Sequence, residues 1–137
     1  MRCPTAVLAG FALSAVVSSV LAGPASAASD EDQVRAVLAG MNGSYNRADF
    51  DSFAAYVCAP MRGAAGFEDG WYASRKADGP TRISVSSVTV AGEPAASAVA
   101  TVRFAAANQP SAKTFDIDFR REGGEWKACR YHPARSI

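Results

Sequence analysis

Histidine is scarce in this sequence, where His132 is the one example among 137 residues. A protein zinc site usually takes about four ligands, drawn mainly from histidine and cysteine, so the sequence predicts no metal site. It also shows neither a catalytic serine-histidine-aspartate context nor a glycine-rich phosphate-binding loop. These absences argue against the common hydrolase and nucleotide-binding classes, and no cofactor is expected.

An excess of charge of either sign is also missing. The chain has 14 lysines and arginines against 13 aspartates and glutamates, and Arg2 is the one basic residue in its first 27 positions. A chain so close to neutrality offers no long-range attraction to nucleic acid or to an anionic membrane surface. Nucleic acid is therefore not an expected partner.

The first 27 residues have the composition of a secretory signal peptide. A single charge at Arg2 precedes an uncharged, strongly apolar stretch from Thr5 to Ala22, and Ala25-Ser26-Ala27 supplies the small residues that signal peptidase cleaves after. We expect residues 1–27 to be removed and residues 28–137 to form a single exported domain. The predicted location is extracellular.

A membrane-spanning helix and a lipid anchor are two alternatives that fit this N-terminal sequence less well than a cleaved signal peptide. The apolar stretch is marginal in length for crossing roughly 30 Å of hydrocarbon, and Gly23-Pro24 follows it. A lipoprotein signal would place the lipid-bearing cysteine directly after Leu21-Ala22-Gly23, where this chain has Pro24. We therefore expect no stable membrane anchor.

Two cysteines remain after the predicted cleavage, Cys58 and Cys129. An even pair in an exported protein usually forms a disulfide, because its compartment is oxidising. A redox-active pair is the alternative, but the two residues are far apart and form no Cys-x-x-Cys motif. The sequence therefore favours a structural disulfide.

Helical spacing marks the first half of the predicted domain. The acidic segment from Ser29 to Asp32 suits a helix N-terminus, and the helix it opens is expected to end near Asn46. Asp49 is expected to cap a second helix that Cys58-Ala59-Pro60 stops. A short third helix is expected between Met61 and Asp78. The first helix is predicted from apolar residues at three- and four-residue spacing, which are Val34, Val37, Leu38, Met41 and Tyr45.

After Pro80 the pattern changes to the period of two that is typical of strands. The alternation shifts its parity across Ser86-Ser87, which predicts a β-bulge, and Gly123-Gly124 predicts a tight hairpin between the last two strands. The predicted fold class is α+β, with two to three N-terminal helices packed on a curved four-stranded antiparallel sheet.

The hairpin raises a question of register. With Gly123-Gly124 as a two-residue turn, Cys129 would pair with Asp118 and face away from the helices. A disulfide to Cys58 needs Cys129 on the helix side. Either the loop contains an odd number of residues, which would pair Ile117 with Cys129, or the disulfide is absent. We favour the odd loop, a three-residue turn with a bulge over Glu122–Gly124.

Two short motifs resemble the nuclear transport factor 2-like superfamily, whose fold is also called a cystatin-like cone. The stretch from Tyr45 to Phe53, Tyr-Asn-Arg-Ala-Asp-Phe-Asp-Ser-Phe, resembles the joint between the first two helices of these proteins. Gly123-Gly124-Glu125-Trp126-Lys127 resembles their late hairpin. The chain is most similar to small exported bacterial members that have one cysteine ending the second helix and one in the last strand. This resemblance implies a cone with an internal pocket.

The superfamily includes ketosteroid-isomerase-like enzymes, which need a general base and a donor for the developing oxyanion. Counted from Asp49, the helix-one hydroxyl would fall near Met41 and the acid near Ala65, and the paired aspartates after the second helix are replaced by Ala59-Pro60. None of these groups is present. No catalytic residue is therefore expected.

Other residues remain as candidates for a site. Tyr45, Tyr56, Trp71 and Tyr72, together with Tyr131, are candidates for lining a pocket, although aromatics at such spacing usually belong to the core. Asp116 and Asp118 alternate with apolar residues and are expected to face solvent, as is His132 at a strand end. If they faced the pocket, these three would be candidates for acid-base chemistry.

The sequence leads to two hypotheses on function. The first is an exported non-catalytic domain that binds a small apolar molecule in its pocket, or a protein at the sheet face, which includes a second copy of itself as a homodimer. The alternative is an isomerase-like or polyketide-cyclase-like enzyme with an atypical acid-base set drawn from Asp116, Asp118 and His132.

Overall fold

The computed structural model describes residues 28–92 and 94–134. The predicted signal peptide, residues 1–27, lies outside the described residues. The elements in chain order are α1 (Asp30–Asn46), α2 (Phe50–Ala54), α3 (Ala59–Arg62), α4 (Phe67–Asp78), β1 (Thr81–Ala91), β2 (Ser97–Ala106), β3 (Lys113–Glu122) and β4 (Glu125–Pro133).

The helix α1 begins and ends where the sequence predicts. The side chain of Ser29 caps its N-terminus by accepting a hydrogen bond from the backbone N–H of Asp32 at 3.1 Å. Three acidic residues occupy its first turn, where they face the positive end of the helix dipole. Val34, Leu38 and Met41 are buried along one face, and this face packs on the sheet.

The joint before α2 is also formed as predicted. Asp49 caps the helix, because its carboxylate accepts from the backbone N–H of Ser52 at 3.1 Å and from the Ser52 hydroxyl at 2.7 Å. These hydrogen bonds lower the pKa of the Asp49 carboxyl group. The helix ends at Ala54, earlier than expected, because the chain then forms a parallel bridge between Val57 and Ala128 of β4.

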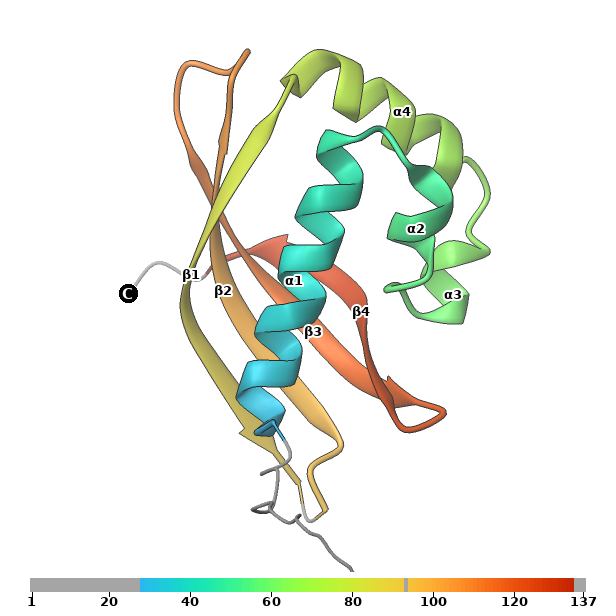
Figure 1. Ribbon diagram of the computed structural model, residues 1–137, viewed down its shortest axis with the longest axis vertical. Coiled ribbons are helices and arrows are strands. Elements are labelled where there is room, and N and C mark those ends of the chain that lie inside the picture. Colours follow the sequence, from blue (N-terminus) through green and yellow to red (C-terminus); the bar gives the residue numbers. More distant parts are fainter. Residues whose placement is uncertain (1–27, 93, 135–137) are drawn as a thin grey trace, which may run out of the picture.

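The four strands form one antiparallel sheet in the order β1-β2-β3-β4. The register of β1 against β2 shifts between Val85 and Ser87, so Ser86 is the extra residue of a β-bulge. This bulge is confirmed where the parity shift predicted it. Figure 1 shows the curved sheet with α1 lying along one face, while α2, α3 and α4 gather at one end of that face.

The β3–β4 hairpin corrects the predicted register. Gly123 and Gly124 form a two-residue turn, with φ of 59° and 83°, which only glycine adopts without strain. Phe119 therefore pairs with Ala128, whereas Asp118 pairs with Arg130. The odd loop was wrong, and the extra residue lies inside β4 instead.

That extra residue is Cys129, which stands between the partners of Phe119 and Asp118. It forms the predicted disulfide with Cys58, with the two Cα atoms 4.9 Å apart and 71 positions apart in sequence. The bulge in β4 thus brings Cys129 within reach of Cys58, which the odd loop was expected to do. The disulfide ties the segment between α2 and α3 to the strand β4.

The core lies between α1, the short helices and the concave face of the sheet. Its fully buried side chains include Val34, Val57, Val102, Ile117 and Phe119. The predicted α+β class is confirmed, and the described residues contain four helical segments where two or three were predicted. Among the described residues, no helix has both the length and the apolar character needed to cross a membrane.

Candidate functional site

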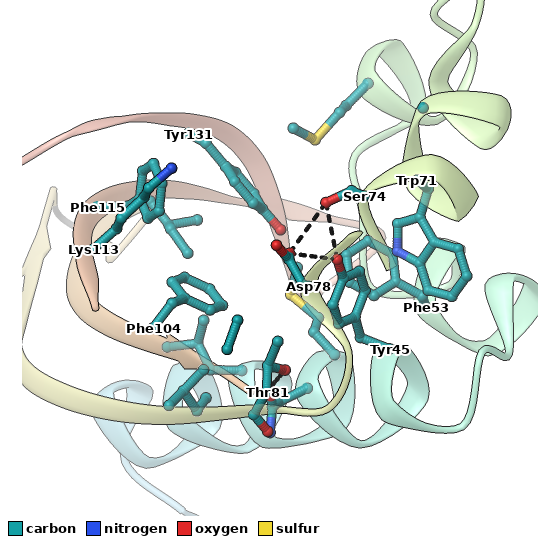
Figure 2. Close-up of a pocket in the computed structure, with 18 of the residues that line it drawn as sticks. Tyr45, Phe53, Trp71, Ser74, Asp78, Thr81, Phe104, Lys113, Phe115 and Tyr131 are labelled. Atoms are coloured by element: carbon teal, nitrogen blue, oxygen red, sulfur yellow. Dashed lines mark hydrogen bonds between the residues drawn. The ribbon is translucent and has the colours of Figure 1, made fainter. Parts of the chain in front are cut away.

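A cavity of about 940 Å³ opens between α1, α4 and one end of the sheet (Figure 2). Its walls come from the second half of α1, from α4, from the ends of all four strands that lie near α4, and from the β2–β3 turn. The side chains that line it include Leu38, Met41, Tyr45, Phe53, Trp71, Ser74, Asp78, Phe104, Gln109, Lys113, Phe115 and Tyr131.

Most of the cavity wall is apolar. Leu38 and Met41 reach it from α1, because they lie on the buried face of that helix. The strands contribute Phe104 and Phe115, whose rings pack edge to face with centroids 5.6 Å apart. These strand positions point inward as a result of the alternation that the sequence shows.

An aromatic cluster closes one side of the cavity around Trp71. The indole lies 5.3 Å from the rings of Tyr45, Phe50 and Phe53, measured between centroids. Its Nε1 is buried and has no hydrogen-bond partner among the described residues. Figure 2 shows the nitrogen edge of Trp71 facing Tyr45, and the two rings meet at 88°. The two rings therefore pack edge to face.

A hydrogen-bonded group of polar side chains faces the cavity beside this cluster. The hydroxyl of Tyr45 donates to Asp78 Oδ2 at 2.8 Å. The hydroxyl of Ser74 lies 2.9 Å from that of Tyr45 and 3.3 Å from Asp78 Oδ2. Gln109 Nε2 donates to Asp78 Oδ1 at 3.2 Å. One carboxylate is therefore held by three side chains from three parts of the chain.

Local structure explains how these residues come together. Ser74 and Asp78 are four positions apart on α4, so their side chains share one face of the helix. Asp78 is the last residue of α4, and its backbone carbonyl accepts from Asn108 N–H in the β2–β3 turn. Gly79 follows with a φ of 69° and turns the chain into β1. Tyr45 comes from the last turn of α1.

Burial raises the pKa of both phenols in the cavity. The pKa of Tyr45 rises to about 12, first through desolvation, while its bond to Ser74 lowers it and its contact with Asp78 raises it. Desolvation also raises the pKa of Tyr131, and the nearby Tyr45 raises it further. Both phenols are therefore protonated, and able to donate, at any physiological pH.

The bulge in β4 decides which side chain this strand presents to the cavity. Ala128 faces the core opposite Phe119, and the extra residue Cys129 restores the inward direction at Tyr131, which pairs with Ile117. Figure 2 shows the Tyr131 hydroxyl pointing toward the group formed by Tyr45, Ser74 and Asp78. Among the described residues, no hydrogen bond to this hydroxyl is found.

The structure places the predicted pocket candidates in different environments. Tyr45 and Trp71 line the cavity. Tyr56 lies on the other side of α1, where its ring packs against Gly40 and lines a second hollow of about 720 Å³. Tyr72 packs on Trp71 at 5.0 Å and is 44% exposed, outside the cavity wall.

Asp78 and Ser74 are not among the site residues predicted from the sequence. A charged residue before Gly79-Pro80 has the pattern of an exposed helix end, and no local signal points to its partner Tyr45, 33 positions away. In the family pattern the hydroxyl of the first helix would fall near Met41, whereas here Tyr45, one turn later on the same face, brings a hydroxyl to the cavity.

The atypical acid-base set of the enzyme hypothesis lies on the opposite face of the sheet. Asp116 accepts a hydrogen bond from Thr101 at 2.6 Å, and Asp118 contacts His132 Nε2 at 3.1 Å. None of these groups lines the cavity. The described residues also contain no group of three or more histidine, cysteine, aspartate or glutamate side chains arranged to hold a metal ion.

The outer face of the sheet is largely polar. Among the described residues, Val99 is the one large apolar side chain of the strands that is exposed, at 38%. The chain therefore presents little apolar surface there. A protein partner or a second copy at this face stays a prediction.

Comparison with solved structures identifies the architecture. A nuclear transport factor 2-like protein of unknown function from Shewanella oneidensis superposes with a TM-score of 0.60 at 13% identity, over 74% of this chain and 95% of that one. A protein of unknown function with a cystatin-like fold from Methylobium petroleophilum gives 0.52 at 15% identity, over 78% and 80%. The chain has the nuclear transport factor 2-like fold.

This nuclear transport factor 2-like fold is shared by proteins with and without known activities. A protein assigned as a scytalone dehydratase, from Novosphingobium aromaticivorans, superposes with a TM-score of 0.53 at 10% identity, over 76% of this chain and 83% of that one. At such identities the likeness establishes the fold and leaves function to the site itself. No protein-family profile and no curated protein matches the sequence.

Proposed function

We propose that this chain is an exported binding protein that holds a small apolar molecule in its central cavity and performs no chemistry on it. The observation that carries the proposal is the cavity of about 940 Å³, with apolar walls and a few polar groups gathered in one place. Sites for small ligands are typically of roughly 300–1,000 Å³ and have this composition.

The hydrogen bonds around Asp78 support binding over catalysis. A general base must be free to take a proton from its substrate, but Asp78 accepts hydrogen bonds from Tyr45 and Gln109. An oxyanion donor must likewise direct its proton at the substrate, and the proton of Tyr45 is directed at Asp78. In this arrangement the hydroxyl proton that catalysis would need is already used within the protein.

A pair of neighbouring substitutions tests the cavity directly. Ala106 lines the cavity at the end of β2, and Ala105 faces the opposite, exposed side of the same strand. We expect the apolar dye N-phenylnaphthylamine to bind with a saturable rise in fluorescence. The Ala106→Trp variant should lose this binding, because the indole fills the cavity, whereas Ala105→Trp should keep it.

Two outcomes would contradict the proposal. One is a dye signal that does not saturate, and the other is equal binding by the two tryptophan variants. Cooperative thermal unfolding of each variant, followed by circular dichroism, ensures that the comparison is made on folded protein. Native mass spectrometry of protein collected from the medium of its producing cells would then show the mass of any molecule that copurifies.

Proton transfer is a second candidate function, and the contact between Tyr45 and Asp78 is the observation that favours it. A carboxylate and a phenol 2.8 Å apart beside an apolar cavity are the groups needed to enolise a ketone. The test is exchange of the α-hydrogens of adamantanone for deuterium, followed by mass spectrometry. Catalysed exchange that Asp78→Asn abolishes would favour the enzyme hypothesis. An exchange rate with protein equal to the rate in buffer alone would exclude this proton transfer.

A further inference from the structure

We propose that the cavity selects an apolar molecule that carries a hydroxyl group, an alcohol or a phenol, and holds that group between Asp78 and Tyr131. The inference rests on the proposed binding function and names the chemical class of its ligand. The two residues leave both a hydrogen-bond acceptor and a hydrogen-bond donor for a ligand.

The group around Asp78 has acceptors to spare. A carboxylate offers about four lone-pair positions, and the hydrogen bonds from Tyr45, Ser74 and Gln109 occupy no more than three of them. The hydroxyl protons of Tyr45 and Ser74 are both used inside the group, where the two oxygens lie 2.9 Å apart. Toward the cavity, the carboxylate and the two hydroxyls therefore present mainly lone pairs.

Tyr131 supplies the complementary donor. Its hydroxyl points toward the same group (Figure 2), and no partner for it is found among the described residues. The side chain lines the cavity, and burial raises the pKa of its phenol. The phenol therefore keeps its proton and has it available for a ligand.

A hydroxyl group matches both sides of this arrangement. It donates its proton to Asp78 and accepts from Tyr131, so that all three groups are satisfied. A ketone of the same shape accepts from Tyr131 but sets its lone pairs against those of the carboxylate. A buried polar group left without a partner costs about 1–3 kcal/mol, which is enough to discriminate between the two ligands.

A carboxylic acid is the main competitor, because Lys113 and Arg130 also line the cavity. Both lie at exposed positions, Lys113 at the start of β3 and Arg130 in β4, where their charged groups are well hydrated and an ion pair with either adds little affinity. An acid that reached the polar group would also meet the negative charge of Asp78. The geometry therefore favours the neutral alcohol.

Three rigid probes of one skeleton separate these classes: adamantanol, adamantanone and adamantane carboxylate. Displacement of N-phenylnaphthylamine, checked by calorimetry, gives their affinities. We expect the alcohol to bind about tenfold more tightly than the ketone or the acid. Equal affinities, or tighter binding of the ketone or the acid, would overturn the inference while leaving the binding function intact. Failure of the dye itself to bind would overturn both.

Variants identify the side chains responsible for the preference for the alcohol. Asp78→Asn brings an amide N–H donor to the site, and we expect it to abolish or reverse the preference for the alcohol. Tyr131→Phe should weaken binding of the alcohol several-fold. Asp118→Asn, a matched change on the outer face of the sheet, should leave all three affinities unchanged. An alcohol preference that survives Asp78→Asn in a folded variant would overturn the assignment.

Discussion

The side-chain amide of Asn46 pairs with both backbone groups of Thr81. Its Oδ1 accepts from Thr81 N–H at 2.7 Å, and its Nδ2 donates to Thr81 C=O at 2.8 Å. The amide thus bonds to the first residue of β1 as a neighbouring strand would. This contact fixes the end of α1, and therefore Tyr45, against the start of the sheet.

Replacing Asn46 with alanine should destabilise the fold. The change leaves Thr81 N–H without its partner, while Thr81 C=O keeps the hydrogen bond from Asn42 Nδ2 at 3.3 Å. We expect the free energy of unfolding to fall by about 1–3 kcal/mol, the cost of one buried group left unpaired, measured by chemical denaturation. Asn46→Asp keeps the acceptor and should lose less. A loss no larger than that of Ser84→Ala, on the exposed face of β1, would contradict this account.

Two glycines in helices should respond to alanine in opposite directions. At Gly40 a Cβ atom would overlap the ring of Tyr56, whereas at Gly70 it would meet nothing within 4 Å. Gly40→Ala should therefore cost about 1–3 kcal/mol through overpacking. Gly70→Ala should gain about 0.5–1 kcal/mol, because alanine loses less conformational entropy in a helix.

The cause of the Gly40 effect can be tested by a double-mutant cycle with Tyr56→Ala. Removing the ring removes the clash, so the double variant should lose less stability than the sum of the two single changes. Strict additivity would show that the contact between Gly40 and the ring is not the origin of the effect. Melting temperatures followed by circular dichroism are sufficient for this comparison.

Alkaline pH should weaken the fold through Tyr45. Its pKa is about 12 in the folded protein and about 10 in an unfolded chain. The folded state therefore prefers the neutral phenol, and this stabilisation is complete below about pH 10 and is lost as the pH rises toward 12. Tyr131, whose pKa is also raised, acts in the same direction.

Absorbance of tyrosinate measures this titration, and denaturant unfolding at each pH measures the stability. In Tyr45→Phe the decline of stability between about pH 10 and 12 should be shallower than in the wild type. An identical decline in both proteins would assign the effect to other groups. Tyr72→Phe, on an exposed ring, provides the control.

The disulfide should contribute strongly to stability. It closes a loop over a sequence separation of 71, for which the chain-entropy model gives about 4 kcal/mol. The double variant Cys58→Ala, Cys129→Ala should lose a free energy of unfolding of this order, and wild type in reductant should approach the same value. A double variant as stable as the oxidised protein would contradict the prediction.

Much of the fold could be predicted because its signals are local. The cap at Asp49, the parity shift at Ser86 and the Gly123-Gly124 turn each lie within a few residues of the structure they specify. The bulge at Cys129 could not be found in this way. The short last strand shows no clear alternation, and the position of its extra residue is set by tertiary contacts with the segment that contains Val57.

The candidate site could be predicted only in part, for a related physical reason. Tyr45 and Trp71 stand out because large aromatic side chains at helical spacing must pack somewhere. Asp78 does not, because a carboxylate at a helix end is usually solvated. Its role depends on residues 33 positions before it and 31 positions after it, Tyr45 and Gln109.

The extra residue in β4 has a consequence for how such a protein can evolve. The pairs on either side of it, Phe119 with Ala128 and Asp118 with Arg130, are those of a regular antiparallel ladder from which Cys129 alone is left out, and Tyr131 then pairs with Ile117. Loss of the Cys129 codon would therefore remove the disulfide and leave Tyr131 turned toward the cavity. The covalent tie and the lining of the cavity can thus be gained or lost independently of each other.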